Sequence, residues 1–293
     1  MISIAVYGRK FHPDKFDSFE KVLKVAEKFS SVIFIQEAFF NSFIEIDSTF
    51  NVKCSTFSSI DELPRGLDVM LSLGGDGTFL EAGTLIGNRN IPILGINLGR
   101  LGYLATASTD DIEEALTSIE QKKYKIEERS VLSATVKGMD LPCPFALNEI
   151  SIQKKYLSMI KIKTYIDDTF LNNYWADGLI IATPTGSTAY SLSVGGPILV
   201  PGSKNFALSP IAPHNLSVRP IVIPDDVTIK CTVECREKDI ILSLDHNTFT
   251  IKENIEIEIK KANHSLKILK TENTDYYSTL REKLLWGIDK RNK

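Results

Sequence analysis

The feature that most constrains the fold of this chain is an apolar run that ends in three glycines and continues as a helix-forming segment. Residues 71–80 read Leu-Ser-Leu-Gly-Gly-Asp-Gly-Thr-Phe-Leu. Glycines at three of four positions permit positive φ and a close approach of backbone to a ligand. The first amides of the following helix would face an anion, which the positive end of the helix dipole favours. The segment predicts a strand, a tight turn and a helix, with a bare turn as the plain alternative.

Strand-like and helix-like segments alternate through the first 129 residues. Apolar runs predict strands at residues 2–7, 32–36, 68–73 and 93–96, and helical spacing of apolar residues predicts helices at 19–29, 78–86 and 110–121. Alternation of this kind is typical of an open α/β domain with a parallel sheet. We therefore predict a Rossmann-like α/β domain over residues 1–129.

The pattern changes near residue 130. Short alternating runs follow at residues 131–137, 160–166, 227–233, 240–244 and 255–259. They predict a β-rich, sandwich-like second domain over residues 130–270. The tail, residues 271–293, is expected to form a helix that packs back on the α/β domain through one apolar stripe. That stripe comprises Tyr277, Leu280, Leu284 and Leu285.

Charge and composition exclude several classes of function. The 34 basic and 37 acidic residues leave a net charge of -3, which argues against a general nucleic-acid binder. The start of the chain lacks a signal-peptide pattern, and no apolar run approaches the roughly 20 residues that span a bilayer. We expect a cytoplasmic protein without membrane contact. Cys231 and Cys235 are expected on one strand face as core thiols, with a metal site as the weaker alternative.

Asp76 is the residue of the glycine-rich turn that needs a chemical explanation. A carboxylate about 4 Å from a phosphate charge is penalised by roughly 4 kcal/mol at an effective dielectric of 20. The aspartate is compatible with phosphate if Mg²⁺ lies between them, or if it accepts a proton from an attacking hydroxyl. The chain has neither the Walker lysine motif nor the Gly-x-Gly-x-x-Gly fingerprint. The turn is therefore a kinase-type turn of another design.

A second polar segment occupies residues 177–197. Five hydroxyl side chains between Thr183 and Ser191 accompany Gly186 and Tyr190, so the loop offers neutral hydrogen-bonding groups and one aromatic ring. Such a loop suits sugar hydroxyls, phosphate oxygens and a purine ring. A Ser/Thr-rich surface loop is the plain alternative, but apolar strand residues and a second glycine turn flank this segment.

Together these segments resemble the NAD kinase family. The resemblance extends in family order over residues 74–80, 97–105, 148–150, 177–197, 213–220 and 280–284. Gly-Gly-Asp-Gly-Thr also occurs in diacylglycerol and sphingoid-base kinases, and in a shorter form in phosphofructokinases. The Thr-Pro-Thr-Gly-Ser-Thr-Ala-Tyr loop is far more specific.

The resemblance implies ATP-dependent phosphorylation of the 2′-hydroxyl of the adenosine ribose of NAD, giving NADP, with a divalent metal such as Mg²⁺. Asp76 would be the general base, and Gly74, Gly75, Gly77 and Thr78 would bind phosphate. The NAD contacts implied are Asp76, Gly77, Asn148, Glu149, Asp177, Thr188, Ala189, Tyr190, Ser191, Leu192, Ser193, Ala212 and Asn247. Family members use some of these from a neighbouring subunit, so a homodimer or homotetramer with sites near subunit interfaces is expected.

Several assignments stay open. Arg100 is either a phosphate contact or a structural residue, and His214 is expected to be a packed side chain. His246 stands where many relatives carry glycine, and the stretch Tyr174-Trp175-Ala176 precedes Asp177 where some relatives have a basic residue. Lys154, Lys155 and Ser158 provide no clear ribose-binding arginine. The preference for NAD or NADH, the use of ATP or polyphosphate, and feedback by NADP or NADPH are not fixed by the sequence.

Two other functions compete with NAD phosphorylation. A lipid kinase would share the glycine turn, but it would need an exposed apolar groove for an acyl chain, and the polar loop argues against that. A non-catalytic NAD-binding protein would bind NAD without consuming ATP, and the intact Asp76 argues against it.

Overall fold

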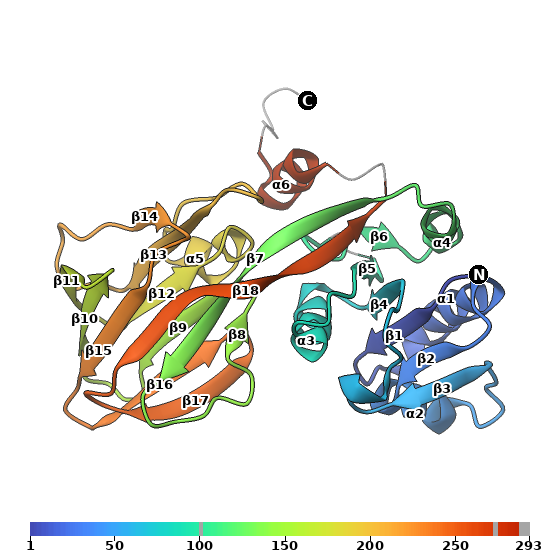
Figure 1. Ribbon diagram of the computed structural model, residues 1–293, viewed down its shortest axis with the longest axis horizontal. Helices are drawn as coiled ribbons and strands as arrows, with labels where there is room; N and C mark the ends of the chain where they lie inside the picture. The colour runs from blue at the N-terminus through green and yellow to red at the C-terminus, as the bar shows by residue number, and fades with distance from the viewer. Residues whose placement is uncertain (100–101, 272–274, 287–293) are drawn as a thin grey trace. The chain divides into compact units, whose positions relative to one another are not determined.

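The computed structural model of the chain describes residues 1–99, 102–271 and 275–286. The chain divides into two compact units (Figure 1). The first comprises Met1–Glu127 with Lys267–Lys293, and the second comprises Glu128–Leu266. Strands β7 (Lys125–Val136) and β18 (Ile257–Lys270) each contribute residues to both units.

The first unit is built on a parallel sheet. Its strand order is β3-β2-β1-β4-β5, formed by Cys54–Phe57, Ile33–Gln36, Ile4–Gly8, Val69–Leu73 and Ile93–Asn97. Every neighbouring pair in this order is parallel. The short β6 (Ala107–Ser108) also pairs in parallel with β5, as does Ile268 of β18. The predicted Rossmann-like α/β fold is confirmed.

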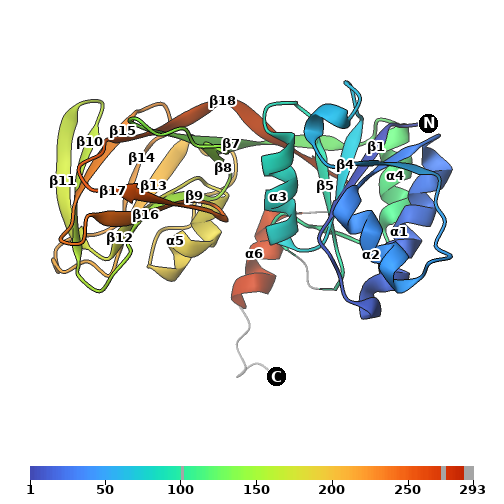
Figure 2. The same cartoon turned by 90° about the horizontal axis from the view of Figure 1, so that it is seen from below.

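Helices cover both faces of this sheet. They are α1 (Phe16–Phe29), α2 (Glu37–Ile46), α3 (Asp76–Ile86) and α4 (Ile112–Glu120), with 3-10 turns at Pro13–Lys15 and Ile60–Glu62. Apolar residues of α1, α2 and α4 share one core with the sheet, for example Leu23, Phe39 and Leu116 with Val6. Helix α3 lies on the opposite face (Figure 2). This arrangement places the start of α3 directly after the end of β4.

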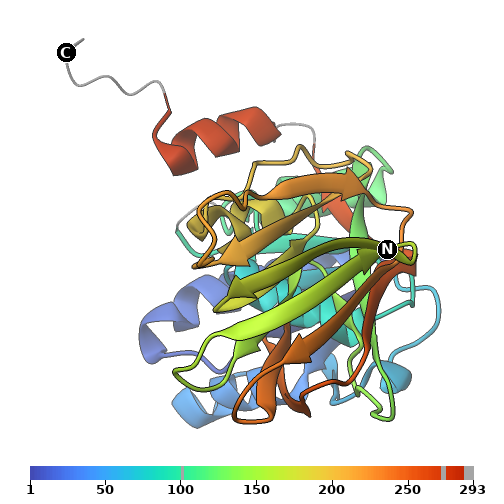
Figure 3. The same cartoon turned by 90° about the vertical axis from the view of Figure 1, so that its left-hand side faces the viewer.

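The second unit consists of two antiparallel sheets around one core. The first has the order β14-β13-β12-β9-β16-β17, formed by Ile221–Pro224, Asn205–Ile211, Gly178–Ala182, Glu149–Lys154, Asp239–Leu244 and Asn247–Lys252. The second contains β11 (Thr169–Ala176), β10 (Ile160–Ile166), β15 (Ile229–Glu234) and β18, and β7 pairs with β18 and with β8 (Phe145–Ala146). The β10–β11 hairpin is yellow-green in Figure 3. Buried residues of both sheets form the shared core, which confirms the β-rich prediction.

Two local predictions are corrected by the structure. Cys231 is fully buried in β15, and burial raises its thiol pKa to about 12, but Cys235 lies after the strand and is only half-buried. Helix α6 (Tyr276–Leu284) follows Asp275, whose carboxylate caps it. Its predicted apolar stripe is not buried as a whole, because Leu280 is buried while Tyr277 and Leu285 are exposed. No helix in the described part of the chain is long and apolar enough to cross a membrane.

Candidate active site

The glycine-rich turn joins the end of β4 to the start of α3. Gly74 adopts a φ of +153°, and a Cβ at this position would lie 2.4 Å from Thr78 Oγ1, so a larger residue does not fit. Gly75 caps the helix, and no atom lies within 4 Å of the position that its Cβ would occupy. The buried Thr78 donates its backbone N–H to the Gly75 carbonyl at 3.0 Å. Space over Gly75 and first-turn amides without intrahelical partners are what a phosphate group requires.

Asp76 is held by the loop that follows β5. Its Oδ2 accepts the backbone N–H of Tyr103 at 2.9 Å, and its Oδ1 accepts those of Leu104 and Ala105 at 3.0 Å each. A Cβ on Gly102 would lie 2.1 Å from Oδ1, so this loop packs directly against the carboxylate. An ionised carboxylate offers about four acceptor positions, so one position remains on Oδ2. The carboxylate therefore has a structural role in addition to the chemical roles that the sequence suggested.

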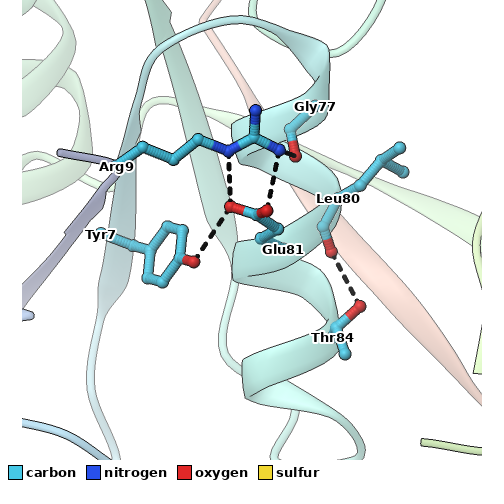
Figure 4. A network of polar contacts seen from close by, with 6 residues as sticks. All are labelled: Tyr7, Arg9, Gly77, Leu80, Glu81 and Thr84. Carbon is cyan, nitrogen blue, oxygen red and sulfur yellow. Dashed lines mark hydrogen bonds and ion pairs between the residues drawn. The ribbon is translucent and has the colours of Figure 1, made fainter. Parts of the chain in front are cut away.

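A network of three side chains supports the first turns of α3 (Figure 4). Glu81 accepts hydrogen bonds from Arg9 Nε at 2.7 Å, Arg9 Nη2 at 2.8 Å and the Tyr7 hydroxyl at 3.1 Å. Arg9 Nη2 also donates to the Gly77 carbonyl at 3.3 Å. Burial and the neighbouring Glu81 charge raise the pKa of Tyr7 to about 12, which keeps its hydroxyl a donor. The sequence did not reveal this network, because Arg9 and Glu81 are 72 positions apart and neither is distinctive alone.

In the second unit, Asn148 and Glu149 lie where the chain enters β9. The backbone N–H groups of Leu147, Asn148 and Glu149 donate to the carboxylate of Asp245 at 2.7, 2.9 and 3.0 Å. Glu149 Oε2 is buried without a hydrogen-bond partner among the described residues. Burial, and then the negative charge of Asp245, raise the pKa of Glu149 to about 8. Near neutral pH this carboxyl group is therefore mostly protonated and both donates and accepts hydrogen bonds.

The hydroxyl-rich loop uses its inner hydroxyl groups to hold itself together. The Thr183 hydroxyl donates to the Leu147 carbonyl at 2.6 Å, and that of Ser187 donates to the Pro184 carbonyl at 2.7 Å. Ser191 is fully buried, and its hydroxyl pairs with that of Ser209 at 3.0 Å. The Ser191 hydroxyl therefore faces the protein interior.

The outer residues of the same loop present a smaller polar surface. They lie on a 3-10 turn, Gly186–Thr188, and on the short helix α5, Tyr190–Ser193. Tyr190 and Ser193 are exposed, and Thr188, Ala189 and Leu192 are partly exposed. The Tyr190 side chain, 38% exposed, is the aromatic ring that this surface offers to a ligand.

The remaining predicted NAD contacts come from three other segments of the second unit. Asp177, between β11 and β12, forms an ion pair with Lys154 at 2.7 Å. Ala212 follows β13 and has a φ of +43°, a conformation that costs an alanine roughly 1–2 kcal/mol. Asn247 begins β17, and its Nδ2 is buried without a hydrogen-bond partner in the described residues. Glu149 and Asn247 are thus the predicted NAD contacts with unmet hydrogen-bonding capacity.

An open pocket of about 900 Å³ lies on the second unit and contains several of the positions left open by the sequence. Its lining includes Lys154, Ser158, Trp175, Asp177 and His214. Lys161 lies 5.6 Å from the centre of the Trp175 ring. The aromatic Trp175 therefore has a cationic neighbour in this pocket wall. His214 donates its backbone N–H to the Trp175 carbonyl at 2.8 Å, so it helps to shape this wall.

Divalent metal ions in proteins are held mainly by acidic, histidine and cysteine side chains. Among the described residues, no group of three or more histidine, cysteine, aspartate or glutamate side chains is arranged to hold a metal ion. Three backbone donors already engage the Asp76 carboxylate. Arg100, a candidate phosphate contact, lies outside the described residues.

Comparisons with known proteins agree across both units. Residues 16–124 match the family model of the ATP-NAD kinase N-terminal domain, and residues 147–271 match that of the C-terminal domain. The NAD kinase of Bacteroides fragilis is 45% identical over 292 residues, covering 99% of this chain and all of the relative. That of Cytophaga hutchinsonii is 40% identical over 290 residues, covering 98% of this chain and 99% of the relative.

Solved structures show the same fold. Yeast NADH kinase in complex with NADH superposes with a TM-score of 0.86 at 24% identity, covering 99% of this chain and 89% of that one. An NAD kinase from Archaeoglobus fulgidus in complex with ATP gives a TM-score of 0.73 at 26% identity, covering 96% of this chain and 98% of that one. Because the family models and the relatives cover nearly the whole sequence, this chain belongs to the ATP-NAD kinase family.

Proposed function

We propose that this protein transfers the γ-phosphoryl group of ATP to the 2′-hydroxyl of the adenosine ribose of NAD, giving NADP and ADP. Relatives named NAD kinase that are 40–45% identical over nearly the whole chain support this activity. The observation that carries the proposal is Glu149, a protonated carboxyl group with one buried, unpartnered oxygen beside the Asn148 amide. Together these side chains supply the donors and acceptors that a vicinal ribose diol requires.

The glycine-rich turn would bind ATP. Backbone amides of Gly75 and Gly77 would hold the phosphates at the positive end of the α3 dipole, because those of Gly74 and Thr78 already donate to the Ile96 and Gly75 carbonyls. The divalent metal would enter with ATP as part of the substrate, where it neutralises charge on the phosphate oxygens. The Arg9–Glu81 pair would keep the first turns of α3 in place while the phosphates bind.

Asp76 would accept the proton of the attacking 2′-hydroxyl. The remaining acceptor position on Oδ2 is the one that would receive it, because the three backbone N–H groups hold the rest of the carboxylate in a fixed orientation. A placed general base typically contributes about 10²–10⁴-fold to the rate. The bound loop also keeps this oxygen from rotating away from the substrate.

The rest of NAD would contact the second unit. Thr188, Ala189, Leu192 and Ser193 would line the dinucleotide, and the exposed Tyr190 ring would stack on a base. Asp177, Ala212 and Asn247 would complete the site, in part from a neighbouring subunit of a homodimer or homotetramer. Size-exclusion chromatography with light scattering would test this oligomeric state. A fully active monomer at assay concentration would contradict a site shared between subunits. The enzyme would act in the cytoplasm.

The activity is tested with purified protein, Mg²⁺-ATP and NAD, with NADP measured by an NADP-specific dehydrogenase. NADH and polyphosphate are tested in parallel as alternative acceptor and donor. NAD binding without NADP formation would indicate a binding protein, and phosphorylation of diacylglycerol instead would indicate a lipid kinase.

The Asp76→Asn variant tests the proposed base. It should bind NAD with near-normal affinity and lose about 10²–10⁴-fold in turnover. Its thermal unfolding is measured alongside, so that loss of folding is not mistaken for loss of the base. Undiminished turnover in the folded variant would refute the role of Asp76.

A further inference from the structure

Asp245 lies in the tight turn between β16 and β17. Leu244 pairs with Asn247 across the hairpin, so Asp245 and His246 alone make the turn. Asp245 has a φ of +50°, in the left-handed region that aspartate tolerates better than most residues. The turn therefore aims the Asp245 carboxylate at the neighbouring strand β9, which pairs with β16.

The Asp245 side chain and backbone hold three successive residues. The carboxylate accepts the N–H groups of Leu147, Asn148 and Glu149, and the Asp245 N–H donates to the Glu149 carbonyl at 3.0 Å. Bonds from a carboxylate to backbone N–H groups are charge-assisted and stronger than neutral ones. The backbone at the start of β9 is thus fixed through its N–H groups.

Thr183 holds the same segment through its carbonyl groups. Its N–H donates to the Asn148 carbonyl at 2.9 Å, and its hydroxyl donates to the Leu147 carbonyl at 2.6 Å while accepting the Gly186 N–H at 3.1 Å. A Cβ on Gly186 would lie 2.0 Å from the Asn148 carbonyl oxygen, so the loop fits only with glycine there. Thr183 is fully buried. Hydrogen bonds from Asp245 on one side and Thr183 on the other therefore fix the backbone of residues 147–149.

We propose that Asp245 and Thr183 are positioning residues of the NAD site. They fix the backbone of residues 147–149 and thereby direct the Asn148 and Glu149 side chains toward the ribose. This inference rests on the proposed NAD kinase function. Asp245 acts on Glu149 in a second way, because its negative charge favours the neutral form of Glu149. Burial raises the pKa of Asp245 itself, and the three backbone N–H donors and then His246 oppose this rise.

Two variants of Thr183 test whether its hydrogen bonds position residues 147–149. Thr183→Val has nearly the same shape but leaves the Leu147 carbonyl and the Gly186 N–H without partners, whereas Thr183→Ser keeps the hydroxyl. Small displacements of binding groups cost up to about 100-fold, so we expect Thr183→Val to raise KM for NAD by about 10- to 100-fold. Thr183→Ser should restore most of the affinity, and KM for ATP should stay unchanged in both.

The Asp245→Asn variant tests the effect of the Asp245 charge on Glu149. NAD binding is measured by calorimetry over a range of pH without ATP, so the readout does not depend on catalysis. Removing the Asp245 charge should move the pH at which Glu149 ionises, and hence the pH dependence of NAD affinity, to lower pH. Asp239→Asn is the control, because Asp239 lies at the other end of β16 and pairs with Lys252. It should leave both affinity and pH dependence unchanged.

The outcomes separate this inference from the function on which it rests. Absence of NADP formation by the unaltered protein would refute the proposed function. An active protein whose Thr183→Val variant keeps normal KM for NAD would overturn the positioning role. An Asp245→Asn variant that keeps the original pH dependence would overturn the effect of the Asp245 charge on Glu149. If Asp245→Asn does not fold, the Thr183→Val and Thr183→Ser pair decides alone, since Thr183→Ser preserves the hydrogen bonds.

Discussion

Replacing Glu149 with glutamine should remove a pH dependence of stability from the second unit. The pKa of Glu149 is about 8 in the folded protein, against a reference value of 4.5. A carboxyl group whose pKa rises on folding contributes stability that is fully present below 4.5 and is lost as pH rises through about 8. At about 1.4 kcal/mol per pH unit, this interval corresponds to roughly 5 kcal/mol. Glutamine has the same shape and stays neutral, so Glu149→Gln should not show this loss.

The assay follows the second unit by its own tryptophan. The chain has two tryptophans, Trp175 in the second unit and Trp286 in the first, so a Trp286→Phe background leaves Trp175 as the reporter. Urea unfolding is measured by fluorescence at intervals between about pH 5 and about pH 9, with and without Glu149→Gln. Titrations common to both proteins cancel in the difference between their unfolding free energies. That difference should grow with pH in favour of the variant by several kcal/mol, approaching about 5 kcal/mol.

A matched control is available in the same unit, between β17 and β18. Glu256 is exposed, so Glu256→Gln removes a carboxylate without removing a buried one, and its unfolding free energy should change with pH in parallel with that of the parent. If the unfolding free energies of Glu149→Gln and the parent also change in parallel over the whole pH range, Glu149 is not held neutral by burial and by Asp245. The reasoning from the Glu149 environment to ribose recognition would then lose its basis.

Other parts of the structure make further predictions. Gly74→Ala should lower the unfolding temperature markedly, because its Cβ would lie 2.4 Å from Thr78 Oγ1, while Gly75→Ala meets nothing within 4 Å and should be tolerated. Equal unfolding temperatures would contradict this. Arg9→Ala should cost about 0.5–1 kcal/mol in urea unfolding, since its pair with Glu81 is half exposed, and a double-mutant cycle with Glu81→Gln should recover most of this as coupling. Cys231, whose pKa burial raises to about 12, should resist thiol reagents in the native protein and react only after unfolding.

Hydrophobic pattern predicted four strands of the parallel sheet but missed helix α2 and strand β3, among other elements. Helix α2 begins at Glu37, directly after β2 ends at Gln36, so no glycine or proline marks the boundary. The Gln36 side chain itself caps the helix by accepting the Phe39 N–H. Strand β3, Cys54–Phe57, is at the edge of the sheet and largely exposed in its middle, so its short polar sequence lacks the apolar run of a buried strand. Both failures arise where tertiary contacts outweigh local pattern.

The site was only partly predictable for a different reason. Motifs directed attention to Asp76, Asn148 and Glu149 because their residue types and order are distinctive. Asp245 and Thr183 act on backbone groups, which every residue possesses, so no pairing of side chains in the sequence identifies them. Asp245 and Leu147 are also 98 positions apart. The hydroxyl-rich loop shows the converse, since its composition indicated ligand binding while its inner hydroxyls stabilise the loop.

The two aspartates share one structural device used for different ends. Asp76 accepts the N–H groups of three successive residues in the first unit, and Asp245 does the same in the second. Each carboxylate thereby fixes a short backbone segment by accepting its N–H groups. In the first unit the carboxylate itself is the proposed reacting group, so the loop orients it. In the second unit Asp245 fixes the backbone that carries the proposed ligand-binding side chains, and it thereby orients them. From the sequence, the charge of Asp76 required either a neighbouring metal ion or a role as proton acceptor. In the structure three backbone N–H groups stabilise part of that charge. The proposed chemistry of Asp76 therefore depends on the one acceptor position that the loop leaves open.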